Sequence, residues 1–526
     1  MVLYAVLNKL DHQKVKDMAI IGSLIKGLID LRDKVVSEPD ALEAQEEVLR
    51  DLLEKAKDTA FGKHYKFEEI LKAEDIKSKF AEKVPFFDYD RINREWWHKM
   101  HEGEVDVTWP GKPPYFALSS GTTGKSSKRI PVTEDMVEAI RQTGIKQVGA
   151  LANFDLPSDF FEKEIMMLGS STDLAKKEDH EEGEISGISA SNIPFWFRNF
   201  YKPGVEIAEI DDWDERVLEI AKNAKNWDIG AITGIPSWTE LMMKKIIEYH
   251  KVNHIHEIWP NLEVYSTGGV AFEPYEKSFN ALLAHPVVVI DTYLASEGFM
   301  AFQSRPQTRS MKLVLDNGIY FEFVPFKAEY INQDGSLKPE APVVALKDVK
   351  EEEEYVLLIS TVSGAWRYLI GDTIKFTDVE RHEIRITGRT KFFLNVVGSQ
   401  LSVNKMNDAV QELEKKFGVK IPEFTIAAIK KDGEFIHKWY LGMEGDASEE
   451  DLAKALDESL QDANKNYKVA RSKALKGVEV VTVTPDVFHS WSERNKKKGG
   501  QVKMEKVMNE EKFADWEKFV HSRSKQ

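Results

Sequence analysis

The stretch from Ser119 to Lys128 gathers hydroxyls, glycines and lysines and reads Ser-Ser-Gly-Thr-Thr-Gly-Lys-Ser-Ser-Lys. Such a loop can bind a polyphosphate, because glycines let backbone N–H groups approach oxygens, hydroxyls donate hydrogen bonds and lysines neutralise charge. Gly124-Lys125-Ser126 matches the end of a Walker P-loop, but Ser119 stands where that motif needs its first glycine. The alternative is a solvated turn. We predict a phosphate-binding loop that is not a Walker loop.

Ordinary elements are expected to position this loop and the turns near it. Residues 115–118 have the pattern of a short buried strand, and Thr133 opens a run of helical spacing. Further apolar runs end in small polar residues and alternate with helical stretches; they cover residues 165–172, 229–235, 262–269 and 287–293. This alternation predicts a largely parallel α/β sheet, whose ligands bind at the carboxyl ends of the strands.

The remaining chain changes in character twice. From Gly318 onward the pattern indicates antiparallel strands, at residues 319–325 and 355–361. Beyond residue 391 a helix, two strands joined at Asp432-Gly433, a second helix and a last strand predict a small two-layer α/β domain. A basic tail follows at residues 496–503 and is expected to be mobile. The acidic stretch at residues 177–187 is expected to be a surface excursion.

Composition excludes several classes of protein. A net charge of −16 argues against a general nucleic-acid binder and against a stable association with anionic membranes. The absence of cysteine excludes disulfides, thiolate nucleophiles and cysteine-bound metals. Neither a signal peptide nor an uncharged membrane span is evident, so we expect a cytoplasmic protein. His254 and His256 lack a third ligand nearby and favour a surface loop over a metal site.

Further motifs follow the loop in a fixed order. Tyr293-Leu294-Ala295-Ser296-Glu297 resembles the Tyr-Gly-x-Thr-Glu signature of adenylate-forming enzymes, and Gly371-Asp372 the end of their Tyr-Arg-x-Gly-Asp signature. Residues 388–398 resemble their hinge signature. The details Phe-Glu-Phe-Val-Pro, Arg-Tyr-x-x-Gly-Asp and Gly-Gly-Gln-Val-Lys are most similar to the Gretchen Hagen family of acyl acid amido synthetases, over roughly residues 55 to 510. Leu294 and Leu369 depart from the glycine and arginine of many relatives.

The resemblance implies an α/β fold with two domains. The large N-terminal adenylate-forming domain would span residues 1–388, with a helical lead-in over 1–75, parallel and mixed sheets, helices and a β-barrel-like part. The small, mobile C-terminal two-layer α/β domain would span residues 389–526, with a hinge near 389–391.

The same resemblance implies an enzyme that uses ATP and Mg²⁺. A carboxylic acid would be converted to acyl-AMP with release of pyrophosphate, and an amino acid amine would then take the acyl group, giving an amide and AMP. Because both reactants of the first step are anions, catalysis should consist of positioning and charge neutralisation. The alternatives are an acyl-CoA ligase that forms a thioester and a nucleotide-binding relative without turnover.

Roles also follow from the resemblance. Glu297 would hold Mg²⁺, Ser296 would contact phosphate or the acyl carboxylate, and Lys503 would contact the α-phosphate. Nucleotide-binding roles are expected for Ser119, Ser120, Gly121, Thr122, Thr123, Gly124, Lys125, Lys128, Gly268, Gly269, Tyr293, Asp372 and Arg389. Among these, Tyr293 would border the adenine, Asp372 and Arg389 would reach the ribose, and Lys391 would be the pivot. The alternatives are a core tyrosine at 293, a turn-capping aspartate at 372 and a solvated lysine at 503.

Overall fold

The structure is a computed structural model, and it divides into two compact units. It describes residues 40–119, 128–157, 159–193, 197–269, 272, 275–332, 336–390, 393–394, 401–431, 433–494, 506–508 and 510–523. The first unit contains the described residues up to 390, and the second those from 393 onward. None of the described helices is both long and apolar enough to cross a membrane.

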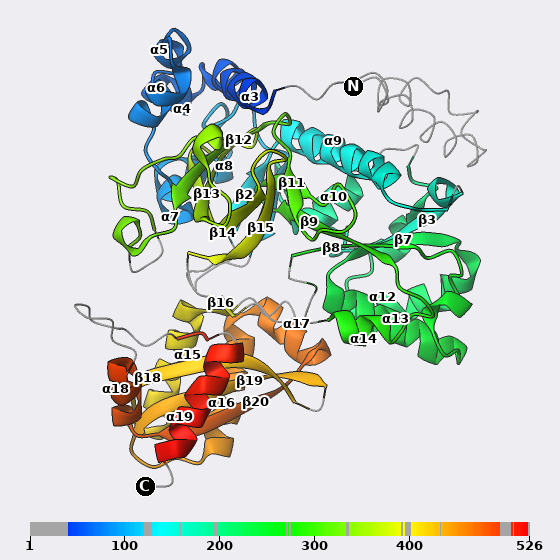
Figure 1. Ribbon diagram of the computed structural model, residues 1–526, viewed down its shortest axis with the longest axis vertical. Helices are drawn as coiled ribbons and strands as arrows, with labels where there is room; N and C mark the ends of the chain where they lie inside the picture. The colour runs from blue at the N-terminus through cyan, green and yellow to red at the C-terminus, as the bar shows by residue number, and fades with distance from the viewer. Residues whose placement is uncertain are drawn as a thin grey trace. The chain divides into compact units, whose positions relative to one another are not determined.

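The first unit combines helices with two sheets (Figure 1). Its helices are α3 (Ala41–Ala56), α4 (Ala60–His64), α5 (Phe67–Leu71), α6 (Ile76–Lys83), α7 (Tyr89–Ile92), α8 (His98–His101), α9 (Glu134–Ala150), α10 (Ile185–Ser191), α11 (Val205–Ala208), α12 (Trp213–Asn223), α13 (Pro236–His250) and α14 (Glu276–Asn280). Its strands are β1 (Tyr115–Ser119), β2 (Lys128–Val132), β3 (Glu164–Leu168), β4 (Ala175–Lys176), β5 (Glu181–Gly183), β6 (Tyr201–Lys202), β7 (Ile229–Gly234), β8 (Val264–Gly268), β9 (Val288–Ala295), β10 (Gly298–Phe302), β11 (Met311–Leu313), β12 (Ile319–Pro325), β13 (Glu354–Thr361), β14 (Tyr368–Asp378) and β15 (Glu383–Arg389).

The larger sheet has 11 strands in the order β12-β13-β14-β15-β11-β10-β9-β8-β7-β3-β6. The strands β3, β7, β8 and β9 run parallel, as expected for their apolar runs that end in small residues, and the short strand β6, which the sequence did not predict, is parallel to β3. From β9 to β12 each pair is antiparallel. The carboxyl ends of β3, β7, β8 and β9 therefore lie at one edge of the sheet.

Helices cover both faces of the parallel part. Gln147 of α9 donates a hydrogen bond to the hydroxyl of Ser266, at 2.9 Å. The neighbouring Tyr265 points to the other face, where its ring stacks on Phe279 of α14. Figure 1 shows α9 on one side of this sheet and α12, α13 and α14 on the other.

The smaller sheet has the order β2-β1-β5-β4. Strand β5 pairs parallel with β1, and Glu182 forms an ion pair with Arg129 of β2. Residues 177–187 are therefore not simply a surface excursion. The polar side chains of this stretch concealed strand β5, which pairs with β1 and β4.

Helix α3 is amphipathic, and its buried stripe includes Leu49, Leu52 and Leu53, as its spacing predicts. Its Gln45 is buried and binds the backbone of the large sheet. The Gln45 side-chain NH₂ donates to the carbonyls of Leu315 and Ile319, at 2.7 and 2.9 Å. The aromatic cluster of Trp96, Trp97 and Trp109 also lies in the core of this unit, as expected.

The second unit contains β16 (Phe393–Leu394), β17 (Leu401–Ser402), α15 (Val403–Phe417), β18 (Lys420–Lys431), β19 (Glu434–Glu444), α16 (Glu449–Ala463), α17 (Lys465–Lys473), β20 (Leu475–Val483), α18 (Pro485–Arg494) and α19 (Glu510–Arg523). Helices α15 and α16 pack on the sheet β18-β19-β20, in the predicted order. Three further helices, α17, α18 and α19, were not predicted, and two of them change the two-layer architecture. Trp491 of α18 and Trp516 of α19 pack with Ala427 and Tyr440 of the sheet and add a third layer.

A buried histidine in this unit has no hydrogen-bond partner. His437 of β19 is 0% exposed, and both of its ring nitrogens are unpaired within the described chain. Its ring stacks on Tyr467, with 5.6 Å between centroids. Burial, followed by the charge of Arg471, lowers the pKa of His437 to about 3.

Replacing His437 by phenylalanine is expected to stabilise the protein by roughly 1 kcal/mol at neutral pH, because two unpaired buried polar atoms are removed. The unfolded histidine titrates near pH ~6.5. Between pH 6.5 and the folded value of about 3 the unfolded state binds the extra proton, so stability falls as the pH falls. Urea unfolding at pH 7.5 and pH 5 should show a smaller pH dependence in the variant. His521→Phe, at an exposed position, is the control, and an unchanged pH dependence in His437→Phe would contradict the assignment.

Candidate adenylation site

The predicted phosphate loop lies between two paired strands. Ser119 ends β1 and pairs with Lys128, which begins β2, so the two ends of the loop are held together. The loop residues Ser120, Gly121, Thr122, Thr123, Gly124 and Lys125 lie outside the described residues. The structure therefore places the two loop ends at the tip of an antiparallel hairpin.

The tip of this hairpin, next to the loop, is supported by Tyr89 of α7. The Lys128 ammonium lies 5.3 Å from the centroid of the Tyr89 ring. The Tyr89 hydroxyl accepts a hydrogen bond from the backbone N–H of Arg129, at 2.9 Å. Tyr89 thus contacts two successive residues of β2 and positions the lysine that closes the loop.

Ser296 and Glu297 form the two-residue turn between β9 and β10. This turn is at the carboxyl end of the last parallel strand, where ligands of such sheets bind. Glu297 is 6% exposed, whereas Ser296 is half-buried. Gly298 follows with φ of 151°, a backbone conformation that other residues rarely adopt.

Tyr368, the first residue of β14, is buried beside this turn. Burial raises the pKa of its phenol well above the usual value, and the negative charge of Glu297 raises that pKa further. Trp97 contacts both Tyr368 and Tyr89, at ring distances of 5.5 and 6.1 Å. A continuous row of aromatic side chains, Tyr89, Trp97 and Tyr368, therefore runs from the hairpin tip at Lys128 to Glu297.

Tyr293 and Asp372 lie in direct contact. The Tyr293 hydroxyl donates a hydrogen bond to Asp372, with 2.5 Å between the oxygens. Three strands separate β9 from β14 in the sheet order, so a flat sheet would place them about 19 Å apart. The antiparallel part of the sheet must therefore curl strongly. The Tyr293 ring packs in the main core, which agrees with the core alternative, while its hydroxyl holds Asp372.

Asp372 and Arg389 are directly opposite each other on β14 and β15. Gly371 precedes Asp372 with φ of 93°, and its carbonyl accepts the backbone N–H of Thr390, at 2.8 Å. The backbone thus brings together the two residues that were expected to reach a ribose.

Replacing Asp372 by alanine is expected to weaken ATP binding by about 1–3 kcal/mol, because hydrogen bonds to a charged group are lost. Calorimetric titration with ATP measures this change. Tyr293→Phe serves as the control for the Tyr293–Asp372 contact, since it removes only the phenol hydroxyl, and its effect should be smaller. Equal ATP affinity in wild type and Asp372→Ala would count against a nucleotide-binding role for this carboxylate.

Gly268 and Gly269 lie at the carboxyl end of β8, beside β9. A Cβ at Gly268 would come within 2.6 Å of the Thr292 hydroxyl, so no side chain fits there. Gly269 has φ of 80°, which favours glycine. Both positions leave the backbone open to a ligand at the edge that also carries Glu297.

A buried ion pair, which the sequence did not reveal, joins two of the motifs. Arg367 donates to both carboxylate oxygens of Glu322, at 3.1 and 2.9 Å. The Nη1 of Arg367 donates hydrogen bonds to the carbonyls of Ala81 and Val84, at 2.9 and 2.7 Å. Glu322 and Arg367 both belong to motifs that the sequence analysis identified. The sequence did not show that the two residues pair with each other. Leu369 packs in an apolar cluster with Val324 and Leu358.

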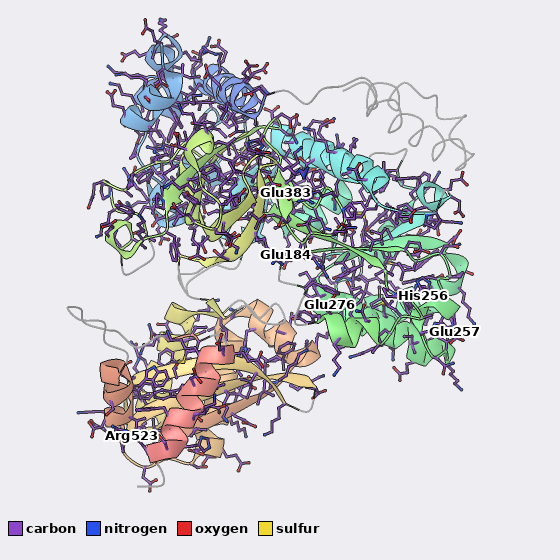
Figure 2. All side chains as sticks on the ribbon, in the orientation of Figure 1. Glu184, His256, Glu257, Glu276, Glu383 and Arg523 are labelled. Atoms are coloured by element: carbon purple, nitrogen blue, oxygen red, sulfur yellow. The ribbon has the colours of Figure 1, made fainter. Side chains whose placement is uncertain are left out.

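A surface loop was expected at His254 and His256, but His256 is buried, with 7% of its surface exposed. The ring nitrogens of His256 are both used: Nδ1 accepts the N–H of Ala284 and Nε2 donates to the carbonyl of Leu262, each at 3.0 Å. Figure 2 shows His256 and Glu257 near α13 and α14. No cluster of three or more histidine or acidic side chains among the described residues could hold a metal ion.

A single carboxylate nevertheless fits Mg²⁺ in a nucleotide site. Mg²⁺ keeps several waters and is commonly held by one or two carboxylates together with substrate phosphates. Glu297 supplies one such carboxylate at the ligand-binding edge of the sheet. Lys503, the other predicted catalytic residue, lies outside the described residues, and so does Lys391.

Three family models match the chain. They are the GH3 family N-terminal domain at residues 36–220, the central domain at 312–389 and the C-terminal domain at 404–512. The chain is 25% identical over 274 residues to indole-3-acetic acid-amido synthetase GH3.4 of Arabidopsis thaliana, a match that covers 48% of this chain and 45% of that protein. It is 22% identical over 548 residues to jasmonoyl–L-amino acid synthetase JAR6 of Nicotiana attenuata, covering 87% and 90%.

Solved structures share the fold. A GH3.15 acyl acid amido synthetase matches with a TM-score of 0.57 and 16% identity, over 95% of this chain and 96% of that one. A 2-hydroxyisobutyryl-CoA ligase, in complex with 2-HIB-AMP and CoA, matches with a TM-score of 0.55 and 13% identity, over 92% and 93%. These likenesses agree with the predicted α/β fold of adenylate-forming enzymes.

Proposed function

The chain belongs to the GH3 family, and from this premise we propose that it is an ATP-dependent acyl-acid amido synthetase. It activates a small carboxylic acid as acyl-AMP, releases pyrophosphate and transfers the acyl group to the amine of an amino acid. The observation that carries the proposal is the Tyr293–Asp372 contact. It joins two motifs far apart in the sequence, beside the turn that holds Glu297.

Activation places two anions in contact, so the site must position them and neutralise their charge. We assign the β- and γ-phosphates to the loop from Ser119 to Lys128, and the ribose to Asp372 and Arg389. Bound Mg²⁺ would neutralise phosphate charge, with Glu297 as its protein ligand. Ser296 lies next to Glu297 and would contact the phosphate or the acyl carboxylate.

The second unit is proposed to contribute to the same reaction. We propose a hinge near residues 389–391, between a large domain that ends at residue 388 and a small mobile domain. Lys503 of the small domain would contact the α-phosphate and the acyl carboxylate. A positive charge there matters most where negative charge develops during attack on the α-phosphorus.

We infer an amine as the acceptor of the acyl group because relatives in the family are named amido synthetases. The fold is also shared by a CoA ligase, which makes thioester formation the second candidate. Pyrophosphate release from pooled carboxylic acids tests the first step. Addition of pooled amino acids or of CoA, followed by mass spectrometry of the product, then separates amide from thioester. ATP binding without pyrophosphate release from any acid would indicate a nucleotide-binding relative.

We also propose a cytoplasmic location and no nucleic-acid partner. A chain without cysteine forms no disulfides and therefore needs no oxidising compartment. Its net charge of −16 disfavours binding to a polyanion such as a nucleic acid.

A further inference from the structure

Arg216 is a buried cation that pairs with no carboxylate in the described part of the chain. It lies in the first turn of α12 and is 6% exposed. Its Nε has no hydrogen-bond partner, and the guanidinium forms no ion pair within the described chain. Burial lowers the pKa of Arg216 despite the opposing influence of Tyr201, Asp211 and Glu184. A buried charge is normally paired, so its isolation calls for a ligand.

Other arginines of this chain are paired. Arg305 donates to both oxygens of Glu383, at 2.7 Å each, and Arg471 to both oxygens of Asp457, at 2.7 and 2.8 Å. Arg367 donates from Nε to both oxygens of Glu322. Arg216 is almost as buried as Arg367, and its lack of a carboxylate within the described chain points to a missing planar anion.

Within the described residues, no side chain or carbonyl pairs with the N–H edge of the Arg216 guanidinium. The Trp213 ring covers one face, with its centroid 5.3 Å from the guanidinium carbon, and Trp213 contacts Trp238 of α13. Tyr201 of β6 is also buried next to the cation. A carboxylate matches the fork of N–H groups along such an edge.

Arg216 lies at the same edge of the sheet as the adenylation site. Helix α12 follows β6, which is parallel to β3, and leads into the parallel strand β7, so it begins at the carboxyl ends of these strands. Ser170 follows β3 and donates a hydrogen bond to Glu184, one of the acids that influence Arg216 (Figure 2). Thr172 is anchored to α11 through Ala208, and its buried hydroxyl is also unpaired.

One extended ligand could lie along this edge. Strand β6, which precedes α12, is separated from β9 by β8, β7 and β3, which is about 19 Å at the usual strand spacing. We propose that Arg216 binds a second carboxylate, carried by the acid substrate at the end opposite to the carboxylate that is activated. The inference rests on the proposed function and assigns its substrate class as dicarboxylic acids.

Binding without ATP provides the first test. Calorimetry compares linear dicarboxylates of increasing length with monocarboxylates of the same length and with inorganic phosphate. Wild type should bind the best-fitting dicarboxylate about 10- to 100-fold more tightly than its monocarboxylate, since a charged, bidentate interaction is added. Arg216→Met should abolish this preference. Lys222→Met removes a positive charge from the exposed side of the same helix and should retain it.

Kinetics provides the second test. In pyrophosphate release, Arg216→Met should raise KM for the dicarboxylate about 10- to 100-fold and leave the monocarboxylate reaction unchanged. Arg216→Lys, which keeps the charge but loses the fork, gives a second variant should the methionine protein fail to fold, and it should show a smaller preference than wild type.

Three results would overturn the proposal. They are equal affinity of wild type for mono- and dicarboxylates, a preference that survives in Arg216→Met, and binding of phosphate alone at Arg216, which would indicate a free anion. Arg216-dependent dicarboxylate binding without pyrophosphate release from any acid would support the site and count against the proposed function instead.

Discussion

Replacing Glu297 by glutamine is expected to reduce pyrophosphate release by about 10²–10³-fold, the range for loss of one preorganised stabilising group. Glutamine keeps the size of the side chain but lacks the negative charge that attracts Mg²⁺. The turn between β9 and β10 should keep its shape, because the pairing of the two strands holds its backbone and the substitution leaves that pairing and Gly298 unchanged. Initial rates of pyrophosphate release, measured over a range of Mg²⁺ concentrations, test this expectation.

A matched control is Glu82→Gln, which alters an exposed glutamate of the same unit. Its activity and its thermal unfolding should equal those of wild type. Glu297→Gln should also unfold like wild type, which separates loss of metal from loss of structure. Wild-type turnover by Glu297→Gln at saturating Mg²⁺ would remove Glu297 from the metal site.

Replacing Arg367 by methionine is expected to destabilise the first unit by about 3–5 kcal/mol, the usual cost of leaving a buried charge unpaired. Glu322 would remain buried with no cation, and the carbonyls of Ala81 and Val84 would lose their donor. Because α6 and β14 meet at Arg367, Tyr368 beside Glu297 should also lose its position. Urea unfolding followed by tryptophan fluorescence measures the loss.

The pH dependence gives this prediction a distinct signature. Burial raises the pKa of Glu322 even with Arg367 in place. A carboxyl with a raised folded pKa contributes stability below its unfolded pKa and loses it as the pH rises through the folded value. Relative to wild type, Arg367→Met should therefore be less destabilised near pH 4.5 than at pH 7.5. The double variant Arg367→Met/Glu322→Met should recover most of the stability, and a purely additive loss would contradict a direct pair.

Local patterns were sufficient for much of the fold. Thr133 caps α9 by accepting the N–H of Met136, and Gly418 ends α15 with φ of 68°. Each of these signals involves residues close together in the chain, so it can be recognised in the sequence. The third layer of the second unit was missed for the opposite reason. Trp491 and Trp516 form this layer by packing on the far face of a sheet. The strands of that sheet come from residues 420–444 and 475–483, so the contact is not local in the sequence.

The same division holds for the candidate site. Residue types and their order determined which side chains could bind ATP, since hydroxyls, glycines and single carboxylates have fixed chemistry. Only the tertiary structure decided that Tyr293 meets Asp372 across three intervening strands, because that contact depends on how strongly the sheet curls. It also decided that Arg367 is paired and that Arg216 has no carboxylate partner among the described residues. The sequence does not distinguish a paired arginine from an unpaired one, because the partners come from elements that are distant in the chain.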